Sequence, residues 1–238
     1  MWSIARRDLL AAFTTPLAWL VLACWLMLTN GVFAWTLHSV HGTPGSHVPL
    51  FVNTLSWGVT FLLLLAPAMT MGAFSGERQI GTLQLLLTVP LREWDLVLGK
   101  FLASAILLAV LVLATLVQVV VLLGISAVQL PHLLAGYGGL LLVAAFMAAL
   151  GCWISLLVDT PVAAYVITFA VLAVLLLLGA LSGDGPLGGV GSALGLTPRA
   201  APFFQGEVRL GNVAYFLGGT GIFLTMTHGA LRARRIHG

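Results

Sequence analysis

The sequence predicts an all-α, polytopic membrane protein with six transmembrane helices. Of its 238 residues, 60% are hydrophobic and only 7% are charged, against about 45–50% and about 25% in soluble proteins. Ten basic and seven acidic side chains could not cover the surface of a soluble domain of this size. The apolar residues also fall into runs of membrane-spanning length, which supports the same class.

Six apolar stretches reach the length of about 20 residues that a spanning helix needs. They run approximately over Leu17–Leu37, Asn53–Phe74, Phe101–Gly124, Leu133–Val158, Val162–Leu181 and Val213–Leu231. These spans leave no room for a second globular domain, so residues 1–238 are predicted to form a single transmembrane domain, with the six spans over 17–231.

The basic residues predict the orientation. With a cytoplasmic N-terminus, eight lie on the inner side, against only Arg199 and Arg209 outside. The inner residues are Arg6, Arg7, Arg78, Arg92, Lys100, Arg232, Arg234 and Arg235. Cytoplasmic loops of membrane proteins are enriched in Lys and Arg, so both termini are expected in the cytoplasm. The net charge of +3 therefore reflects orientation and does not indicate a nucleic-acid partner.

Residues 1–16 have an amphipathic pattern of their own. Trp2, Ala5, Leu9 and Phe13 recur at helical spacing, and Pro16 should end the helix. This predicts an interfacial helix lying on the membrane. A cleavable signal is the competing interpretation, but the apolar run is too long and no small-residue cleavage site follows it.

The segment 75–100, between the second and third spans, is the longest inner segment. Its strongly polar side chains are Glu77, Arg78, Gln79, Arg92, Glu93, Asp95 and Lys100. Between them, Thr82 can cap a short helix and Pro90 should end it. Such a helix suits docking into a groove of a cytoplasmic partner; the alternative is a surface loop that only joins two spans.

The residues GERQIGTLQLLLTVPL at 76–91, followed by LGKF at 98–101, resemble the signature of ABC-2 type transporter permeases. FFQGEV at 203–208 and VAYFL at 213–217 resemble the gliding-motility-associated subgroup of that family. One departure is Gln84, where many members carry Glu.

The resemblance implies a permease subunit of an ATP-driven exporter in a bacterial inner membrane. Segment 75–100 would contain a coupling helix seated in a separate ATP-binding subunit, and residues 1–15 would be the connecting helix on the inner leaflet. The contact residues would be Glu77, Arg78, Gly81, Thr82, Leu83, Leu86 and Pro90. The expected partners are the lipid bilayer, that subunit with its ATP and Mg, a second permease, identical or not, and extracytoplasmic accessory subunits.

The chain is not expected to be an enzyme itself or to bind a cofactor. A phosphate-binding loop needs Gly-x4-Gly-Lys-Ser/Thr, whereas Lys100, the only lysine, is followed by Phe101. No catalytic residue is therefore predicted, and ATP hydrolysis is assigned to the partner. A non-transporting membrane anchor of an envelope complex is the alternative. An intramembrane protease built on Ser126 and His228 is a remoter one, because Ala127 replaces the expected glycine.

Isolated polar residues within the spans are candidates for a substrate pathway. These are Asn53, Trp57 and Thr60 in the second span and Gln118 in the third. The alternative role is interhelical hydrogen bonding, which such groups commonly perform. No charged residue suggests ion coupling inside the spans, and this favours energy supplied from outside.

Three further segments carry weaker signals. His38, His41 and His47 invite a metal site, but no cysteine or carboxylate accompanies them, so a solvated loop and no metal are expected. The turn 159–161 is predicted to start a helix, with Thr160 as the cap and Pro161 in first position. The spacing of apolar residues in the outer loop 182–212 permits a short helix that dips into the outer leaflet; the alternative is an ordinary ordered connection between two spans.

Overall fold

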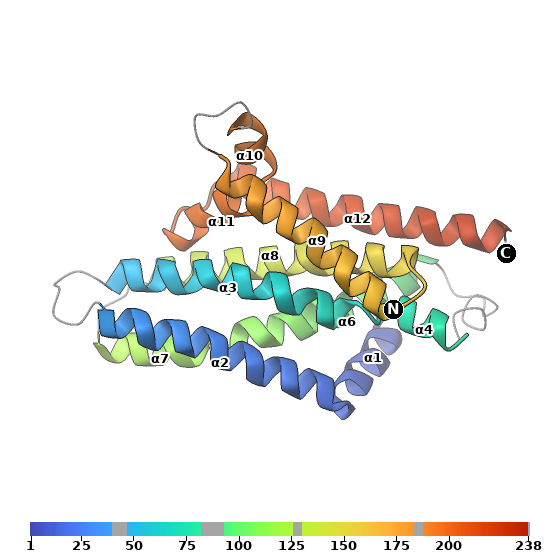
Figure 1. Cartoon of the computed structure of the whole chain (residues 1–238), viewed down its shortest axis with the longest axis horizontal. Helices are drawn as coiled ribbons and strands as arrows, with labels where there is room; N and C mark the ends of the chain where they lie inside the picture. The colour runs from blue at the N-terminus through green and yellow to red at the C-terminus, as the bar shows by residue number, and fades with distance from the viewer. Residues whose placement is uncertain (40–46, 82–92, 126–129, 183–187, 238) are drawn as a thin grey trace.

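The computed structural model describes residues 1–39, 47–81, 93–125, 130–182 and 188–237, and every regular element within them is an α-helix (Figure 1). The longer helices are α1 (Trp2–Thr14), α2 (Pro16–Ser39), α3 (His47–Thr70), α6 (Glu93–Ala114), α7 (Leu116–Ile125), α8 (Leu130–Leu157), α9 (Pro161–Ala180) and α12 (Leu210–His237). Three short ones are α4 (Ser75–Gln79), α10 (Gly188–Leu194) and α11 (Leu196–Phe204). The predicted all-helical class is confirmed for these residues.

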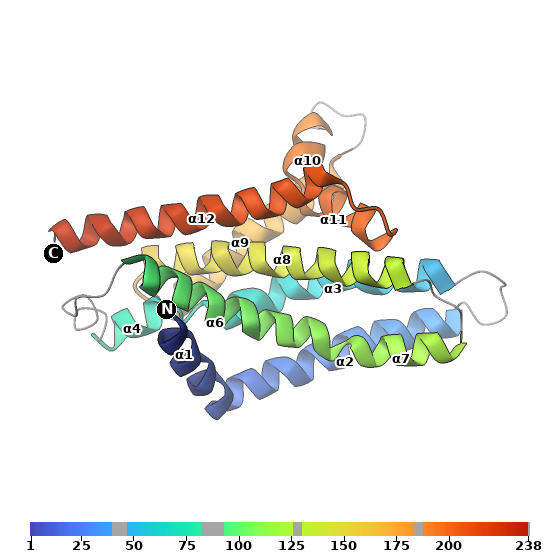
Figure 2. The same ribbon diagram turned by 180° about the vertical axis from the view of Figure 1, so that it is seen from behind.

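Helix α8 is the centre of the bundle and packs against α3, α6, α9, α11 and α12 (Figures 1 and 2). Small residues allow this close approach. A Cβ atom at Gly151 would lie 2.1 Å from Oγ1 of Thr70 on α3, and one at Gly139 would lie 2.4 Å from Cβ of Phe203 on α11. Small residues at helix crossings are typical of membrane bundles, where tight packing replaces the hydrophobic effect.

Five helical stretches in the described ranges are long and apolar enough to cross a membrane. They are Pro16–Ser39, Leu50–Gln79, Glu93–Gly124, Leu130–Leu157 and Pro161–Ala180. They correspond to the first five predicted spans. Helix α12 has the necessary length, with 28 residues, but is more polar than the other five, so the sixth span stays a prediction.

The third span begins earlier than its hydropathy predicts. The described part of helix α6 already includes Glu93, ahead of the predicted start near Phe101, and Glu93 and Asp95 in its first turn complement the positive end of the helix dipole. At Thr115 the helix breaks and continues as α7. The hydroxyl of Tyr137 on α8 lies 3.1 Å from the Thr115 carbonyl oxygen and donates to it, which holds the break in place.

Helix α1 lies at an angle to α2 (Figures 1 and 2). The elbow is Thr15, in an extended conformation with φ −89° and ψ 144°, followed by Pro16, the first residue of α2. Proline carries no amide hydrogen and cannot continue the hydrogen-bond ladder of α1. The amphipathic segment is therefore a separate helix, free to take its own direction.

Within the segment 182–212, the described residues include two short helices, α10 and α11, which lie toward the end of the bundle opposite the chain's N-terminus (Figure 1). The apolar side chains of α11 are buried in the protein: Leu196, Ala200, Phe203 and Phe204 are 0–2% exposed. The expected helix is present, but its apolar face packs on the bundle and is not available to the outer leaflet. The physical reason is the small-residue surface of α8, which accepts Phe203.

Candidate functional site

Four charged side chains from three helices meet at the end of the bundle that carries the N-terminus. Lys100 on α6 places Nζ 2.6 Å from Oε1 of Glu77 on α4 and 3.0 Å from Oδ2 of Asp8 on α1. Arg7 completes the group, with Nη2 2.9 Å from both Glu77 Oε1 and Asp8 Oδ1. We call Arg7, Asp8, Glu77 and Lys100 the ion cluster. Two positive and two negative groups compensate one another in it.

The packing of α1 on α6 explains why Lys100 is buried. A Cβ atom at Gly99 would lie 3.1 Å from both Cβ of Ile4 and the Met1 carbonyl oxygen, so the absence of a side chain brings the helices together. The Lys100 side chain is then only 5% exposed, with its ammonium 5.9 Å from the centre of the Phe74 ring. A buried ammonium is costly unless it is paired, and Asp8 and Glu77 supply that pairing.

Ser155 on α8 fixes the position of α4. Its hydroxyl oxygen accepts hydrogen bonds from the amides of Phe74 and Ser75, each at 3.1 Å, and its hydroxyl donates to the Met71 carbonyl oxygen at 2.8 Å. These amides belong to the break between α3 and α4, where helical partners are missing. One fully buried side chain thus holds the turn that presents Glu77.

A second ion pair ties α4 to the turn between α8 and α9. Arg78 donates to Asp159, whose side chain is 85% exposed. The same turn begins α9 as predicted: Thr160 Oγ1 accepts from the Ala163 amide at 3.3 Å, and Pro161 takes the first helical position. This helix start is confirmed. The turn also contacts α4, in addition to reversing the chain.

A third contact fixes the first turn of α6. Nε2 of His228 on α12 lies 3.3 Å from Oε2 of Glu93, and the imidazole stacks on the Trp94 ring with 4.3 Å between centroids. Residues 82–92 lie between α4 and α6, so both flanks of that segment are attached to the bundle. Such an arrangement can transmit a mechanical load.

Arg7 remains charged in the ion cluster. Burial acts to lower the pKa of its guanidinium, but the hydrogen bond and charge of Asp8, with the charge of Glu77, outweigh this and raise the pKa above its usual value. Arg7 therefore keeps its positive charge at any physiological pH.

The coupling residues predicted from the sequence fall into two groups. Glu77 and Arg78 lie in α4 and are paired, and Gly81 has φ +78°, a left-handed conformation that favours glycine. Thr82, Leu83, Leu86 and Pro90 lie outside the described residues. Arg7 and Lys100 were missed as partners of Glu77, and Asp8 as a partner of Lys100. The available signal was a single lysine at the edge of an apolar run.

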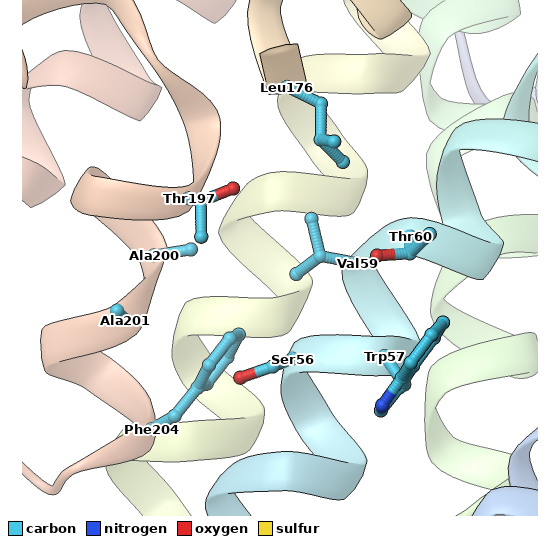
Figure 3. Close-up of a pocket in the computed structure, with 9 residues that line it drawn as sticks. All are labelled: Ser56, Trp57, Val59, Thr60, Leu176, Thr197, Ala200, Ala201 and Phe204. Carbon is cyan, nitrogen blue, oxygen red and sulfur yellow. The ribbon is translucent and has the colours of Figure 1, made fainter. Parts of the chain in front are cut away.

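A cavity of about 180 Å³ lies between α3, α9 and α11 (Figure 3). Its lining residues are Ser56, Trp57, Val59, Thr60, Leu176, Thr197, Ala200, Ala201 and Phe204. Two of the predicted pathway residues, Trp57 and Thr60, are among them. The lining has three hydroxyl groups and no charge, so its chemistry suits an apolar or amphipathic molecule.

The other two predicted pathway residues lie elsewhere. Asn53 Nδ2 donates to Thr36 Oγ1 at 3.1 Å and links α3 to α2, which is the interhelical role considered above. Gln118 on α7 is 5% exposed and borders a separate cavity of about 10 Å³ beside Thr54 and Tyr137. The structure brings Trp57 and Thr60 together and leaves Asn53 and Gln118 apart from them.

The histidines of the first predicted outer loop are described only in part. His38 is exposed at the end of α2, whereas His41 and the side chain of His47 lie outside the described residues. Within the described ranges, no group of three or more His, Cys, Asp or Glu residues has a metal-binding arrangement. Ser126 also lies outside those ranges, while His228 is engaged with Glu93 and Trp94.

Comparison with known protein families assigns the chain to a family of transporters. Residues 10–189 match the family model described as ABC-2 family transporter protein. The chain belongs to this family. As an ABC-2 family member it is a multi-pass membrane permease subunit of the ABC transporter type.

Two curated relatives share the name "Probable ABC transporter permease protein NosY". The one from Pseudomonas aeruginosa is 37% identical over 119 residues, which are 49% of this ABC-2 chain and 42% of the relative. The one from Stutzerimonas stutzeri is 33% identical over 115 residues, 48% of this chain and 41% of the relative. The match thus spans less than half of each relative's length.

Proposed function

We propose that the chain couples ATP hydrolysis by a separate ATPase subunit to the movement of a substrate, or of force, across a bacterial inner membrane. The observation that carries the proposal is the attachment of both flanks of segment 82–92. Glu77 and Arg78 hold one flank, and Glu93 holds the other. Because both flanks are attached, a partner that displaces this segment would also displace α4 and α6.

The proposed topology has six spans with both termini in the cytoplasm, α12 being the sixth. The charge distribution supports this orientation: α1, α4, the start of α6 and the turn at Asp159 all carry charged residues at one end of the bundle (Figure 1). Helix α1 would lie on the inner leaflet. Exposed Trp2 and Leu10 beside Arg6 suit the boundary between headgroups and acyl chains.

The proposed partners follow from the family. An ATP-binding subunit holding ATP and Mg would receive segment 82–92 through Thr82, Leu83, Leu86 and Pro90. A second permease, identical or not, would complete a dimer, and extracytoplasmic accessory subunits could join it. The proposed place in the gliding-motility-associated subgroup rests on residues 203–208 and 213–217, and the two relatives carry a different name.

The cavity beside Trp57 and Thr60 is the proposed part of the pathway, with export as the direction. Its uncharged lining supports an amphipathic or lipid-linked substrate. Asn53 and Gln118 are not needed for this route, because neither borders that cavity. The alternative is that the chain anchors an envelope complex and transports nothing. The experiment must distinguish this alternative from the permease.

The test is purification of the tagged chain from its native membranes in mild detergent, with partners identified by mass spectrometry. Recovery of an ATP-binding subunit in about equal amount supports the proposal. ATP hydrolysis by the reconstituted complex is then compared with that of Glu77→Gln and of a deletion of residues 82–87. Both changes should abolish permease-stimulated hydrolysis, whereas Arg209→Ala, at an exposed ion pair of the opposite end, should leave it unchanged.

Recovery of the chain alone, under conditions that preserve other membrane complexes, would favour the anchor. Full permease-stimulated hydrolysis in both changed proteins would show that coupling does not use this segment.

A further inference from the structure

The contacts of α1 are concentrated on α6 and α4. Asp8 pairs with Lys100 at 3.0 Å, Arg7 pairs with Glu77 at 2.9 Å, and Ile4 packs against Gly99. The two pairs of Lys100 are largely withdrawn from solvent: the side chains of Lys100, Glu77 and Asp8 are 5%, 17% and 20% exposed, whereas that of Arg7 is 55% exposed. Ion pairs shielded in this way are weakened little by salt.

The connection of α1 to α2 is of a different kind. Pro16 has no amide hydrogen and cannot donate the helical hydrogen bond that would join it to α1, and Thr15 is exposed and extended. Trp19 Nε1 donates to the Phe13 carbonyl oxygen at 2.9 Å, and the Phe13 and Trp19 rings meet edge to face. Trp19 is 57% exposed, so solvent or lipid can replace its contacts with Phe13 at a small cost in free energy.

We infer that α1 moves as one rigid body with α4 and the first half of α6, held there by Lys100, and that it bends against α2 at Thr15–Pro16. This inference rests on the proposed function, since it assigns α1 to the part of the permease that the ATPase moves. Lys100 is then a positioning residue. It sets where α1 lies and touches no substrate or nucleotide.

Lys100 has this role because its ammonium group pairs with residues of two other helices, α1 and α4, at once. Glu77 lies before segment 82–92 and Lys100 lies after it, so their pair closes the base of that segment. The pair with Asp8 adds α1 to the same base. A displacement delivered to segment 82–92 is therefore shared by α4, α6 and α1. The first span, α2, receives it only through the elbow.

The first test is a reversible cross-link in the complete complex with its ATPase, with Cys24→Ser and Cys152→Ser as background. Ile4→Cys and Gly99→Cys place two thiols where the Cβ positions approach to 3.1 Å, near the disulfide range of about 3.5–4.5 Å. If α1 and α6 move together, ATP-dependent turnover will be the same in the oxidised and the reduced protein. Loss of turnover on oxidation, with recovery on reduction, would overturn the inference and leave the proposed function standing.

The second test avoids the crowded position at Gly99. Spin labels are attached through cysteines that replace Ala11 on α1 and either Leu102 on α6 or Ala23 on α2. With nucleotide bound, the distance between 11 and 102 should stay constant, while that between 11 and 23 should change. The opposite pattern, or a constant distance between 11 and 23 during turnover, would overturn the inference. Absence of any ATPase partner would overturn the proposed function and the inference with it.

Lys100 itself is tested with the same labels. Lys100→Met should broaden the distance between 11 and 102 and lower nucleotide-stimulated turnover by about two- to thirty-fold, while Lys100→Arg should restore both. Rescue by arginine separates positioning by charge from a merely space-filling role. An unchanged distance distribution in Lys100→Met would show that Lys100 does not hold α1.

Discussion

The two ends of the bundle use charged residues in opposite ways. At the end that carries the ion cluster, Lys100 and its partners Asp8 and Glu77 form a largely buried group, and the more exposed Arg7 lies at its edge. At the other end, Arg199 has neutral partners: it donates to the Asn212 side-chain oxygen and the Ala193 carbonyl oxygen, each at 3.3 Å, and lies over the Tyr215 ring. Arg209 there pairs with Glu207 in solvent. The burial of each charged group, more than its residue type, sets how much it contributes to stability.

This difference fits the roles proposed for the two ends. A buried ion pair adds little net stability compared with an apolar contact, but removal of one partner is costly because the other charge stays buried. Such a cluster therefore favours one relative position of α1, α4 and α6. The opposite end uses neutral hydrogen bonds and packing to hold α10 and α11 in place. Substitutions at the two ends should consequently cause losses of stability of different size.

The largest effect is expected from Lys100→Met, which leaves Glu77 and Asp8 with Arg7 as the only remaining positive member of the ion cluster. The expected loss of stability is about 3–5 kcal/mol. Lys100→Arg keeps the charge and should lose much less. Thermal unfolding of the purified protein in detergent measures both. Equal melting temperatures for Lys100→Met and the wild type would show that the cluster is solvated and not buried.

The next largest effect is expected where α8 meets its neighbours. A methyl group at Gly151 would overlap Thr70, and one at Gly139 would overlap Phe203. Gly151→Ala and Gly139→Ala should each cost about 1–3 kcal/mol through overpacking. The matched control is Gly138→Ala, because the added carbon meets nothing within 4 Å. The same detergent unfolding assay applies. Equal stability of all three variants would contradict this packing.

A smaller effect is expected from Arg199→Ala. The variant loses two hydrogen bonds to neutral groups and the contact with the Tyr215 ring, which together are worth about 1–2 kcal/mol. Hydrogen exchange should become faster in α10 and α11 while the ion-cluster end stays unchanged. Arg199→Lys should rescue little, because an ammonium group cannot reproduce the planar fork of the guanidinium. Uniformly faster exchange over the whole chain would instead indicate a global loss of stability.

The sequence predicts the five described spans because hydropathy is a local property of each stretch. It places the start of the third span too late, since windows of apolar residues exclude Glu93, Asp95 and Lys100, although these residues continue the helix. The ion cluster could not be predicted at all. Asp8 and Lys100 are far apart in sequence, and only the packing of Ile4 on Gly99 brings them together.

The candidate pathway shows the same limit. Helical spacing places Asn53, Trp57 and Thr60 close together on one helix, but it does not say which neighbour each residue meets. Asn53 finds Thr36 on α2, while Trp57 and Thr60 border the cavity with α9 and α11. Polar residues in a span can thus be found from sequence alone, whereas their roles depend on the neighbouring helices.

The smallest effect is expected from Arg209→Ala, which completes the contrast between the two ends. Its guanidinium lies 2.7 Å from the Glu207 carboxylate, close to the 2.6 Å between Lys100 and Glu77. The side chains of Arg209 and Glu207 are, however, 66% and 52% exposed, so water and salt replace the pair easily. The expected loss is at most about 0.5 kcal/mol, measured by the same unfolding assay as for Lys100→Met. A loss as large as that of Lys100→Met would mean that distance and not burial sets the strength of these pairs, and the contrast between the two ends would fail.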